Sequence, residues 1–397
     1  MLAATLAQVS TPANAGHAPH LHQSTASPLA EIPFVLRGDH VLLDVTVNGV
    51  RGWLILDTGS SVSSVDAAWA RSAANVRVLP GRAQVQGSGN VAITLGQADS
   101  IRVGPVEMRD VMVALVPLDA VSRAHGIPVR GTLGFDFISR YVVEIDYAAR
   151  RLRLYDPAAY TYAGGGVQVP VSLAMRIPMV QATVTPQGGS PLPARLLLDL
   201  GSGVLAVRLM APFVQEHRLL ATSGGYTAPI GTGVGGTVVG RIARLDAVDV
   251  AGLWVTRPIV GMAERPEGFF GTTMADGTVG APVFRRTRMI LDYTRSRVIF
   301  EPARGFDAPY EPEMSGMMLG AAPGDAVTVD YVVASGPAAR AGITPGDILL
   351  SVDGRPARAD ELDRIREAFA RAHTQHRLTL RRGTSTRTVT LTTRRMV

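Results

Sequence analysis

The sequence predicts a mainly β protein that consists of two duplicated, barrel-like lobes followed by a smaller α+β domain. The duplication is visible as landmarks that recur at one spacing: residues 132–134 match residues 278–280, and residues 145–147 match residues 291–293, each 146 positions later. Within each copy, short runs rich in Val, Ile and Leu are punctuated by Gly, Pro and Asn. This is the pattern of short strands joined by turns.

The repeat and the composition divide the chain into four segments. Residues 1–32 are expected to form a leader or a disordered linker, residues 33–157 the first lobe, residues 158–305 the second lobe and residues 306–397 the α+β domain. Three prolines between residues 301 and 313 mark a linker before the last segment.

The composition is that of a globular protein and excludes several classes of function. Of its 397 residues 46% are hydrophobic and 18% are charged, and the net charge is +6. All 39 basic residues are Arg, which we interpret as genome composition, and no Arg cluster is interleaved with aromatic residues, so no nucleic-acid partner is predicted. The chain has no Cys, which excludes disulfides and thiolate catalysis, and no apolar run of the ~18 residues that a stable membrane span needs.

The first residues have the composition of an export signal. Residues 13–15 (Ala-Asn-Ala) precede Gly16 and fit a small-x-small cleavage site. The segment before them is short and lacks a basic start, so it is either a truncated signal peptide, which we favour, or a disordered tail. A signal peptide would place the mature protein in the periplasm or outside the cell.

Two short motifs carry the chemistry of the chain. Asp-Thr-Gly-Ser occupies residues 57–60 after one apolar run, and Asp-Leu-Gly-Ser occupies residues 199–202 after another. We therefore expect Asp57 and Asp199 at the ends of two buried strands, each in a turn that contains glycine. Two carboxyl groups about 3 Å apart cannot both ionise, so such a pair shares one proton and can activate a water.

These motifs and their repetition resemble those of the aspartic proteases, over residues 33–305. In that fold each Asp-containing loop lies beside a loop with an apolar residue and a glycine, which here correspond to Leu133-Gly134 and Val279-Gly280. The lobe length is similar to that of bacterial retropepsin-like proteases, and the presence of both lobes in one chain is similar to pepsins. The resemblance implies peptide hydrolysis by Asp57 and Asp199 together, with no metal and no cofactor.

The residues next to the two aspartates have physical roles. Gly59 and Gly201 allow the backbone to approach the carboxyl groups where a Cβ would intrude. Ser60 and Ser202 can donate hydrogen bonds that favour the charged carboxylates, and by resemblance serine at this place predicts an acidic optimum.

Position 200 is the one departure from the family pattern. Thr58 is expected to reach across to the opposite loop and lock the two lobes, whereas Leu200 has no hydroxyl group with which to do the same. Half of a reciprocal pair of hydrogen bonds is missing, each worth about 1 kcal/mol. The sequence is compatible with an asymmetric active site and with a decayed one.

A hairpin that covers the substrate is expected in each lobe. The tip candidates are Gly87, Ser88 and Gly89 in the first lobe, and Gly233 and Gly235 in the second. Both segments are equally compatible with plain surface hairpins.

The last 85 or so residues resemble the PDZ domains of bacterial exported proteases. Residues 336–343, 346–347 and 352–354 carry the resemblance. The stretch that corresponds to the carboxylate-binding loop of such domains is Met317, Met318, Leu319 and Gly320.

A PDZ domain binds an extended peptide by strand addition in a groove between a strand and a helix. Here we expect a strand over residues 326–333 and a helix over residues 360–372 to form that groove. It could recruit substrates to the protease, or it could dock a segment of its own chain and restrain the site.

Three functional hypotheses follow from the sequence. The first is an aspartic endopeptidase, a monomer that acts on peptides or unfolded proteins and recruits them through the PDZ domain. The second is an inactive protease-fold scaffold that binds a peptide or C-terminus through the PDZ domain, which Leu200 favours. The third is a homodimer of first lobes, against which the internal duplication argues.

Overall fold

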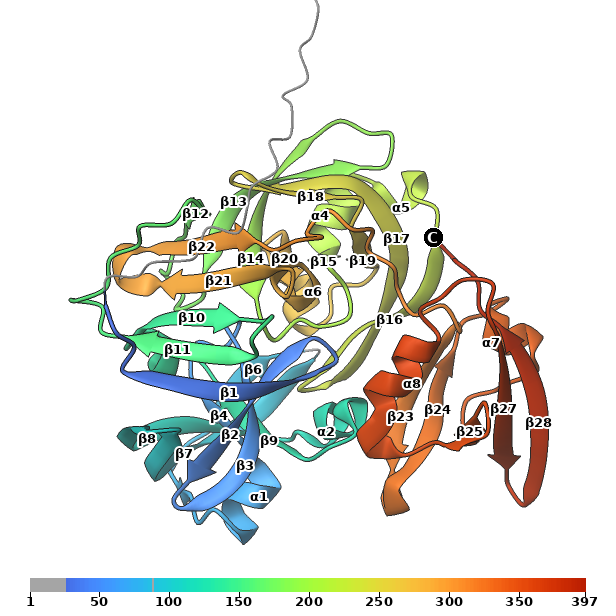
Figure 1. The fold of residues 1–397 in the computed structure, drawn as a ribbon, viewed down its shortest axis with the longest axis horizontal. Coiled ribbons are helices and arrows are strands. Elements are labelled where there is room, and N and C mark those ends of the chain that lie inside the picture. The colour runs from blue at the N-terminus through green and yellow to red at the C-terminus, as the bar shows by residue number, and fades with distance from the viewer. Residues whose placement is uncertain (1–25, 88) are drawn as a thin grey trace, which may run out of the picture.

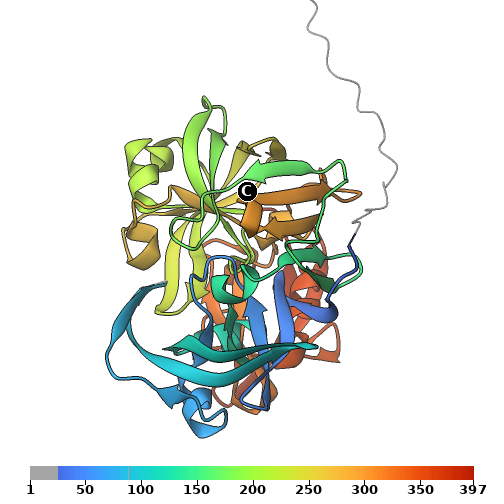
Figure 2. The same ribbon diagram turned by 90° about the vertical axis from the view of Figure 1, so that its left-hand side faces the viewer.

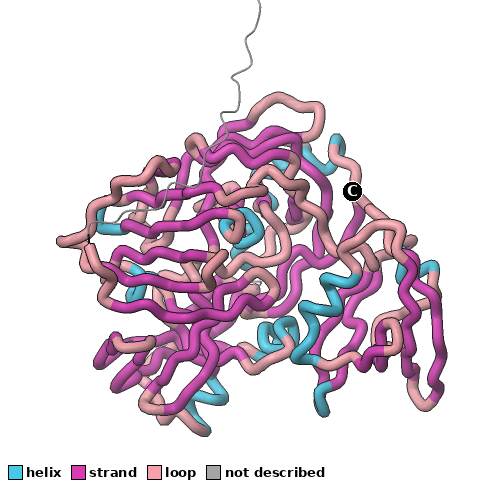
Figure 3. The backbone as a smooth tube through the Cα atoms, viewed as in Figure 1, coloured by secondary structure: helices cyan, strands magenta, loops and turns pink. Residues whose placement is uncertain are grey.

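The computed structural model describes residues 26–87 and 89–397, and its elements are overwhelmingly strands (Figure 3). The predicted fold class is confirmed: the protein is mainly β, with an aspartic-protease-like fold followed by a PDZ domain. Figures 1 and 2 show the two protease lobes on either side of a shared sheet and the PDZ domain packed beside them.

The first lobe begins at Ala30, ahead of the boundary predicted at residue 33. Its elements are β1 (Ala30–Arg37), β2 (His40–Val47), β3 (Val50–Leu56), β4 (Ser64–Asp66), α1 (Ala67–Ser72), β5 (Arg77–Val78), β6 (Ala83–Gln86), β7 (Asn90–Val103), β8 (Val106–Val116), α2 (Asp119–His125), β9 (Val129–Leu133), α3 (Phe135–Ile138), β10 (Val142–Asp146) and β11 (Arg151–Tyr155).

The second lobe repeats much of this order. Its elements are β12 (Val167–Pro170), β13 (Met179–Pro186), β14 (Leu192–Asp199), β15 (Val207–Leu209), α4 (Ala211–Glu216), α5 (Leu219–Thr222), β16 (Tyr226–Gly233), β17 (Gly236–Val250), β18 (Leu253–Thr256), β19 (Ile259–Ala263), η1 (Gly268–Gly271), β20 (Gly277–Gly280), α6 (Ala281–Phe284), β21 (Thr287–Asp292), η2 (Tyr293–Arg295) and β22 (Arg297–Pro302).

The PDZ domain contains the remaining elements of the chain. They are β23 (Met317–Ala322), η3 (Pro323–Asp325), β24 (Ala326–Val332), α7 (Pro337–Arg340), β25 (Ile348–Val352), β26 (Arg355–Pro356), η4 (Ala359–Glu361), α8 (Leu362–Ala368), β27 (Gln375–Arg382) and β28 (Ser385–Thr392).

The two lobes are joined by an antiparallel sheet that both of them build. Its strand order is β12-β22-β21-β10-β11-β1, so that β10 of the first lobe pairs with β21 of the second, with Val143 opposite Leu291. These strands are the repeated landmarks of the sequence. The equivalent strands of the two copies pair with each other, and the loops that carry Asp57 and Asp199 face each other across the two lobes.

A hydrophobic core runs through both lobes and extends beneath the loops that carry Asp57 and Asp199. It includes Leu56, Leu200 and Leu291, all fully or nearly fully buried. The PDZ domain has a separate core centred on Leu362, Ile365 and Phe369. Separate cores indicate that the PDZ domain is a folding unit of its own.

None of the helices in the described part of the chain is both long and apolar enough to cross a membrane.

Candidate active site

The first aspartate is delivered by a buried parallel strand pair. Strand β3 ends at Leu56 and runs parallel to β9, with Leu56 opposite Leu133. The Asp57 backbone N–H donates to the Leu133 carbonyl at 3.0 Å, and the Gly59 N–H donates to Asp57 Oδ1 at 2.8 Å. The turn therefore holds the carboxyl group at the strand end, in the orientation set by the backbone of Gly59.

The second lobe builds the same arrangement at the equivalent positions. Strand β14 ends at Asp199 and runs parallel to β20, with Asp199 opposite Gly280. The Gly201 N–H donates to Asp199 Oδ1 at 3.0 Å. The Ala281 N–H donates to the Ser202 carbonyl at 2.8 Å, as the Phe135 N–H does to the Ser60 carbonyl at 2.9 Å in the first lobe.

The structure brings the two carboxyl groups within hydrogen-bonding reach of each other. Each one also packs on the glycine of the opposite loop. A Cβ placed on Gly59 would lie 2.6 Å from Asp199 Oδ1, and a Cβ on Gly201 would lie 2.5 Å from Asp57 Oδ1. Any other residue at either glycine would push the two carboxyl groups apart.

Burial of this pair makes its double ionisation unfavourable. Burial raises the pKa of Asp57 above its ordinary value, although the Gly59 N–H and the nearby His40 act in the opposite direction. Burial, with a further contribution from the charge of Asp57, raises the pKa of Asp199 to about 8. Since the two groups titrate as a unit, we treat these shifts as properties of the pair. The pair therefore retains one proton at neutral pH.

The two serines differ in their surroundings. The Ser60 hydroxyl hydrogen-bonds to Asp57 and lies 3.3 Å from Thr132 Oγ1. Ser202 is nearly fully buried and lies 3.4 Å from Thr278 Oγ1. The serine of the first loop thus acts on its carboxylate, in the direction of a lower pKa.

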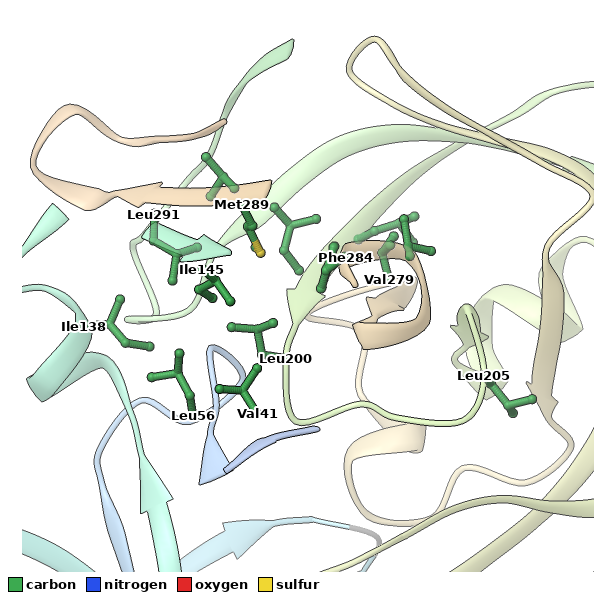
Figure 4. Close-up of a cluster of buried hydrophobic side chains, with 14 of the residues drawn as sticks. Val41, Leu56, Ile138, Ile145, Leu200, Leu205, Val279, Phe284, Met289 and Leu291 are labelled. Carbon is green, nitrogen blue, oxygen red and sulfur yellow. The ribbon is translucent and has the colours of Figure 1, made fainter. Parts of the chain in front are cut away.

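The threonine of the first loop links the two lobes. Thr58 Oγ1 donates to the Leu198 carbonyl at 2.6 Å and accepts from the Leu200 N–H at 2.9 Å. The equivalent side chain, Leu200, instead packs among apolar groups, beside Val41 and Leu56 (Figure 4). The lock between the loops is therefore one-sided.

The two candidate hairpins meet at their tips. The β6–β7 hairpin of the first lobe carries Gly87, where a Cβ would lie 2.3 Å from the carbonyl oxygen of Val234 in the β16–β17 hairpin of the second lobe. The Phe269 N–H of η1 donates to the Gly87 carbonyl at 2.9 Å. Of the remaining tip candidates, Gly89 lies against Gly235, Gly233 ends β16, and Ser88 lies outside the described residues.

Two residues close to the pair were not predicted from the sequence to lie there. His40 Nε2 lies 3.0 Å from the Gly201 carbonyl oxygen, and the buried Arg208 interacts electrostatically with Asp199. His40 has no informative spacing in the sequence. Arg208 does leave a signal, because it interrupts the apolar run of residues 204–210.

The strand predicted to line a peptide-binding groove of the PDZ domain does not lie at an edge of its sheet. Residues 326–333 were expected to line it, but β24 is paired on both sides, with β23 and with β25. The strand order ends at β23 on one side and at β28 on the other, and β23 contains the predicted carboxylate-binding stretch. The prediction was wrong because Met317–Ala322 lacks the β-branched residues that mark a strand. The helix expected over residues 360–372 is shorter, a 3₁₀ turn followed by α8.

The predicted peptide-binding residues divide between the core and the surface of the PDZ domain. Met317 and Leu319 are buried in its core, Met318 is 37% exposed, and Gly320 packs against Asp330 of β24. Gly320 therefore allows the side chain of Asp330 to lie across β23.

The PDZ domain is docked on the first lobe through β23 and α8. Helix α2 lies beside both (Figure 1). Arg366 of α8 donates to the Leu319 carbonyl at 3.0 Å and to the Ala124 carbonyl of the first lobe at 2.8 Å. Asp363 accepts from the Gly38 N–H with both carboxylate oxygens at 3.2 Å.

Comparisons with known proteins agree with this architecture. Residues 43–137 match a family model described as aspartyl protease, and residues 328–382 match a model described as PDZ domain. The crystal structure of an aspartic proteinase from Irpex lacteus is similar at a TM-score of 0.45 and 12% identity, covering 70% of this chain and 98% of that one. No curated protein matches the chain.

The two family-model matches identify an aspartyl protease-like segment and a PDZ domain in the chain. The matched segment of the protease contains Asp57 and Leu133-Gly134, and so covers the first lobe. The second lobe is assigned by its structure, which repeats the strand pairing and the loop hydrogen bonds of the first.

Proposed function

We propose that the chain is an aspartic endopeptidase in which Asp57 and Asp199 together activate one water for attack on a peptide bond. The observation that carries this proposal is the packing of each carboxyl group on the glycine of the opposite loop, within hydrogen-bonding reach of its partner.

The chemistry requires only the shared proton of the pair. The ionised carboxyl group takes a proton from the water, whose oxygen bonds to the peptide carbonyl carbon, while the protonated carboxyl group donates to the carbonyl oxygen. The tetrahedral intermediate then collapses, the C–N bond breaks, and the leaving amine takes up a proton. The two hairpins that meet at their tips would close over the peptide and exclude bulk water.

The pH dependence follows from the same pair. The active form carries one proton, so activity is lost as the pH falls low enough to protonate both groups. It is also lost as the pH rises through about 8, where burial no longer holds the last proton. The Ser60 hydroxyl lowers the pKa of Asp57 and so favours the acidic side of this window, and by resemblance serine at this place goes with an acidic optimum, so we propose an optimum below pH 7.

We propose further that the PDZ domain binds an extended peptide or a C-terminus along the open edge of β23. Helix α2 already lies beside this edge, so a bound peptide is expected to loosen the contact between the PDZ domain and the first lobe. Periplasmic or secreted placement of the protein is also proposed, on the composition of its first residues.

The test is cleavage of unfolded casein and of a mixed peptide library between pH 3 and 9. Asp57→Asn and Asp199→Asn are compared with wild type, and Asp44→Asn, a half-exposed partner of Arg51, serves as the matched control. We expect both variants of the pair to lose at least 1,000-fold in kcat while remaining folded, and the control to keep full activity.

Each other outcome identifies a different function. Loss of activity only in Asp57→Asn would favour the homodimer of first lobes. A folded wild type that never cleaves would favour the inactive scaffold, since Leu200 already departs from the pattern.

A further inference from the structure

A buried arginine connects the second catalytic loop to the hairpin of the same lobe. Arg208 lies on β15 and is only 8% exposed. Its Nε donates to the Ile230 carbonyl of β16 at 2.5 Å, and its Nη2 donates to the carbonyl of Gly203, which follows the Asp199 turn. One side chain therefore fixes the position of the loop relative to the hairpin.

The charge of this guanidinium has no carboxylate partner in direct contact. None of the ion pairs among residues 26–87 and 89–397 involves Arg208, and the two atoms that accept its hydrogen bonds are uncharged carbonyl oxygens. Burial of a cation without a compensating anion is strongly unfavourable. The charge that interacts with it is that of Asp199.

The first lobe has no such cation at the equivalent place. Arg208 of β15 lies opposite Thr278, and in the first lobe Ser64 of β4 lies opposite Thr132. Ser64 Oγ forms a neutral hydrogen bond with Thr132 Oγ1 at 2.9 Å. The positive charge is thus a feature of the second lobe alone, added to a site that otherwise repeats.

We propose that Arg208 is a positioning residue of the active site, which holds the Asp199 loop against the lobe 2 hairpin and supplies the positive charge that stabilises the singly ionised pair. This inference rests on the proposed function of Asp57 and Asp199, and it explains why the guanidinium is buried.

The two other ionisable groups beside the pair, His40 and Tyr293, interact with Asp57, whereas the charge of Arg208 interacts with Asp199. His40 faces Asp57 from β2, and the buried Tyr293 faces Asp57 from η2, where burial raises the pKa of its phenol and keeps it neutral. Burial lowers the pKa of Arg208 to about 10, so the guanidinium stays charged throughout the working range. Its positive charge lowers the pKa of Asp199.

The experiment compares the pH profile of kcat/KM for wild type, Arg208→Gln and Arg208→Lys. Gln removes the charge and keeps a donor, whereas Lys keeps the charge but lacks the forked geometry of the guanidinium. Arg195→Met, on β14 and 50% exposed at its side chain, is the matched control. We expect both limbs of the profile to move up by about one pH unit or more in Arg208→Gln.

Lysine should restore the wild-type profile and leave a higher KM, because the hairpin is no longer fixed by two hydrogen bonds. A folded Arg208→Gln with the wild-type profile would overturn the proposal, and so would a Lys variant whose profile moves as far as that of Gln. A purely structural role would lower activity without moving the limbs.

The titration of the pair tests the inference even without cleavage. Carbon-13 NMR of the aspartate side chains reports the apparent pKa values of the pair in wild type, Arg208→Lys and Arg208→Gln. If the wild type never cleaves, the proposed function fails, yet a shift of these values in Arg208→Gln alone still supports the role of Arg208. Unchanged values would refute it.

Discussion

The loops that carry Asp57 and Asp199 form the same backbone hydrogen bonds but are held in place in different ways. The first loop is fixed by its own lobe: Asp136 Oδ1 accepts from the Ser63 N–H at 2.6 Å and from Ser63 Oγ at 2.9 Å, and the same hydroxyl accepts from the Gly134 N–H at 3.0 Å. In the second lobe, 146 positions after Asp136, stands Pro282, which cannot form these bonds.

The second loop is supported from outside. Thr58 of the first lobe binds the backbone on both sides of Asp199, and His40 of the first lobe lies against the Gly201 carbonyl. Gly203 packs so closely on the β1–β2 turn that a Cβ would lie 2.5 Å from the Gly38 carbonyl oxygen. The first loop is therefore fixed within its own lobe, whereas the second is held by Arg208 of its own lobe and, in addition, by docking on the first lobe.

Among the variants that test this difference, Thr58→Val is expected to have the largest effect on stability. The side chain keeps its shape but loses its hydroxyl, so the Leu198 carbonyl and the Leu200 N–H lose their partner in a buried place. Each unsatisfied group costs about 1–3 kcal/mol, and we expect the free energy of unfolding to fall by about 2–4 kcal/mol. Urea denaturation at pH 6 measures it.

The control for this variant is Thr256→Val, at an exposed position of β18, which should stay within about 0.5 kcal/mol of wild type. A loss in Thr58→Val no larger than that of the control would mean that the second loop does not depend on the first lobe.

Asp363→Ala tests whether the PDZ domain also helps to hold the Asp199 loop in place. Asp363 holds the Gly38 N–H, and the turn of Gly38 and His40 in turn contacts Gly201 and Gly203. Removal of the carboxylate should misplace the second loop slightly. We expect kcat on a peptide too short to reach the PDZ groove to fall by about 3- to 10-fold.

The matched control is Glu367→Ala, an exposed residue of the same helix. An Asp363→Ala enzyme that loses activity only on long substrates would show that the PDZ domain recruits peptides without positioning the loop.

The sequence predicted what the two lobes share, because shared features repeat along the chain. The strand ends at Asp57 and Asp199 and the glycines that follow them could be read from two motifs and one spacing. Of the features that differ, the sequence showed the change from Thr58 to Leu200 but not the change from Ser64 to Arg208. The exchange of Ser64 for Arg208 becomes visible only when the strand register places both opposite equivalent threonines. Likewise, the open edge at β23 depends on which strands pair, and local propensity does not determine that.

Leu200→Thr is the variant expected to have the smallest effect. It restores the threonine of the family pattern and so tests whether the second loop can bind the first loop as Thr58 binds the second. The new hydroxyl would enter the apolar cluster beside Val41 and Leu56, and the loss of two buried methyl-sized groups costs about 1–2 kcal/mol (Figure 4). If it copies Thr58, it gains two hydrogen bonds to the first loop, worth about 1 kcal/mol each. These contributions offset, so we expect a change in the free energy of unfolding within about 1 kcal/mol and activity within about threefold of wild type.

A loss as large as that of Thr58→Val would mean that the second lobe has repacked around leucine and that the one-sided lock is now required. A large gain in activity would instead identify Leu200 as a defect in the active site.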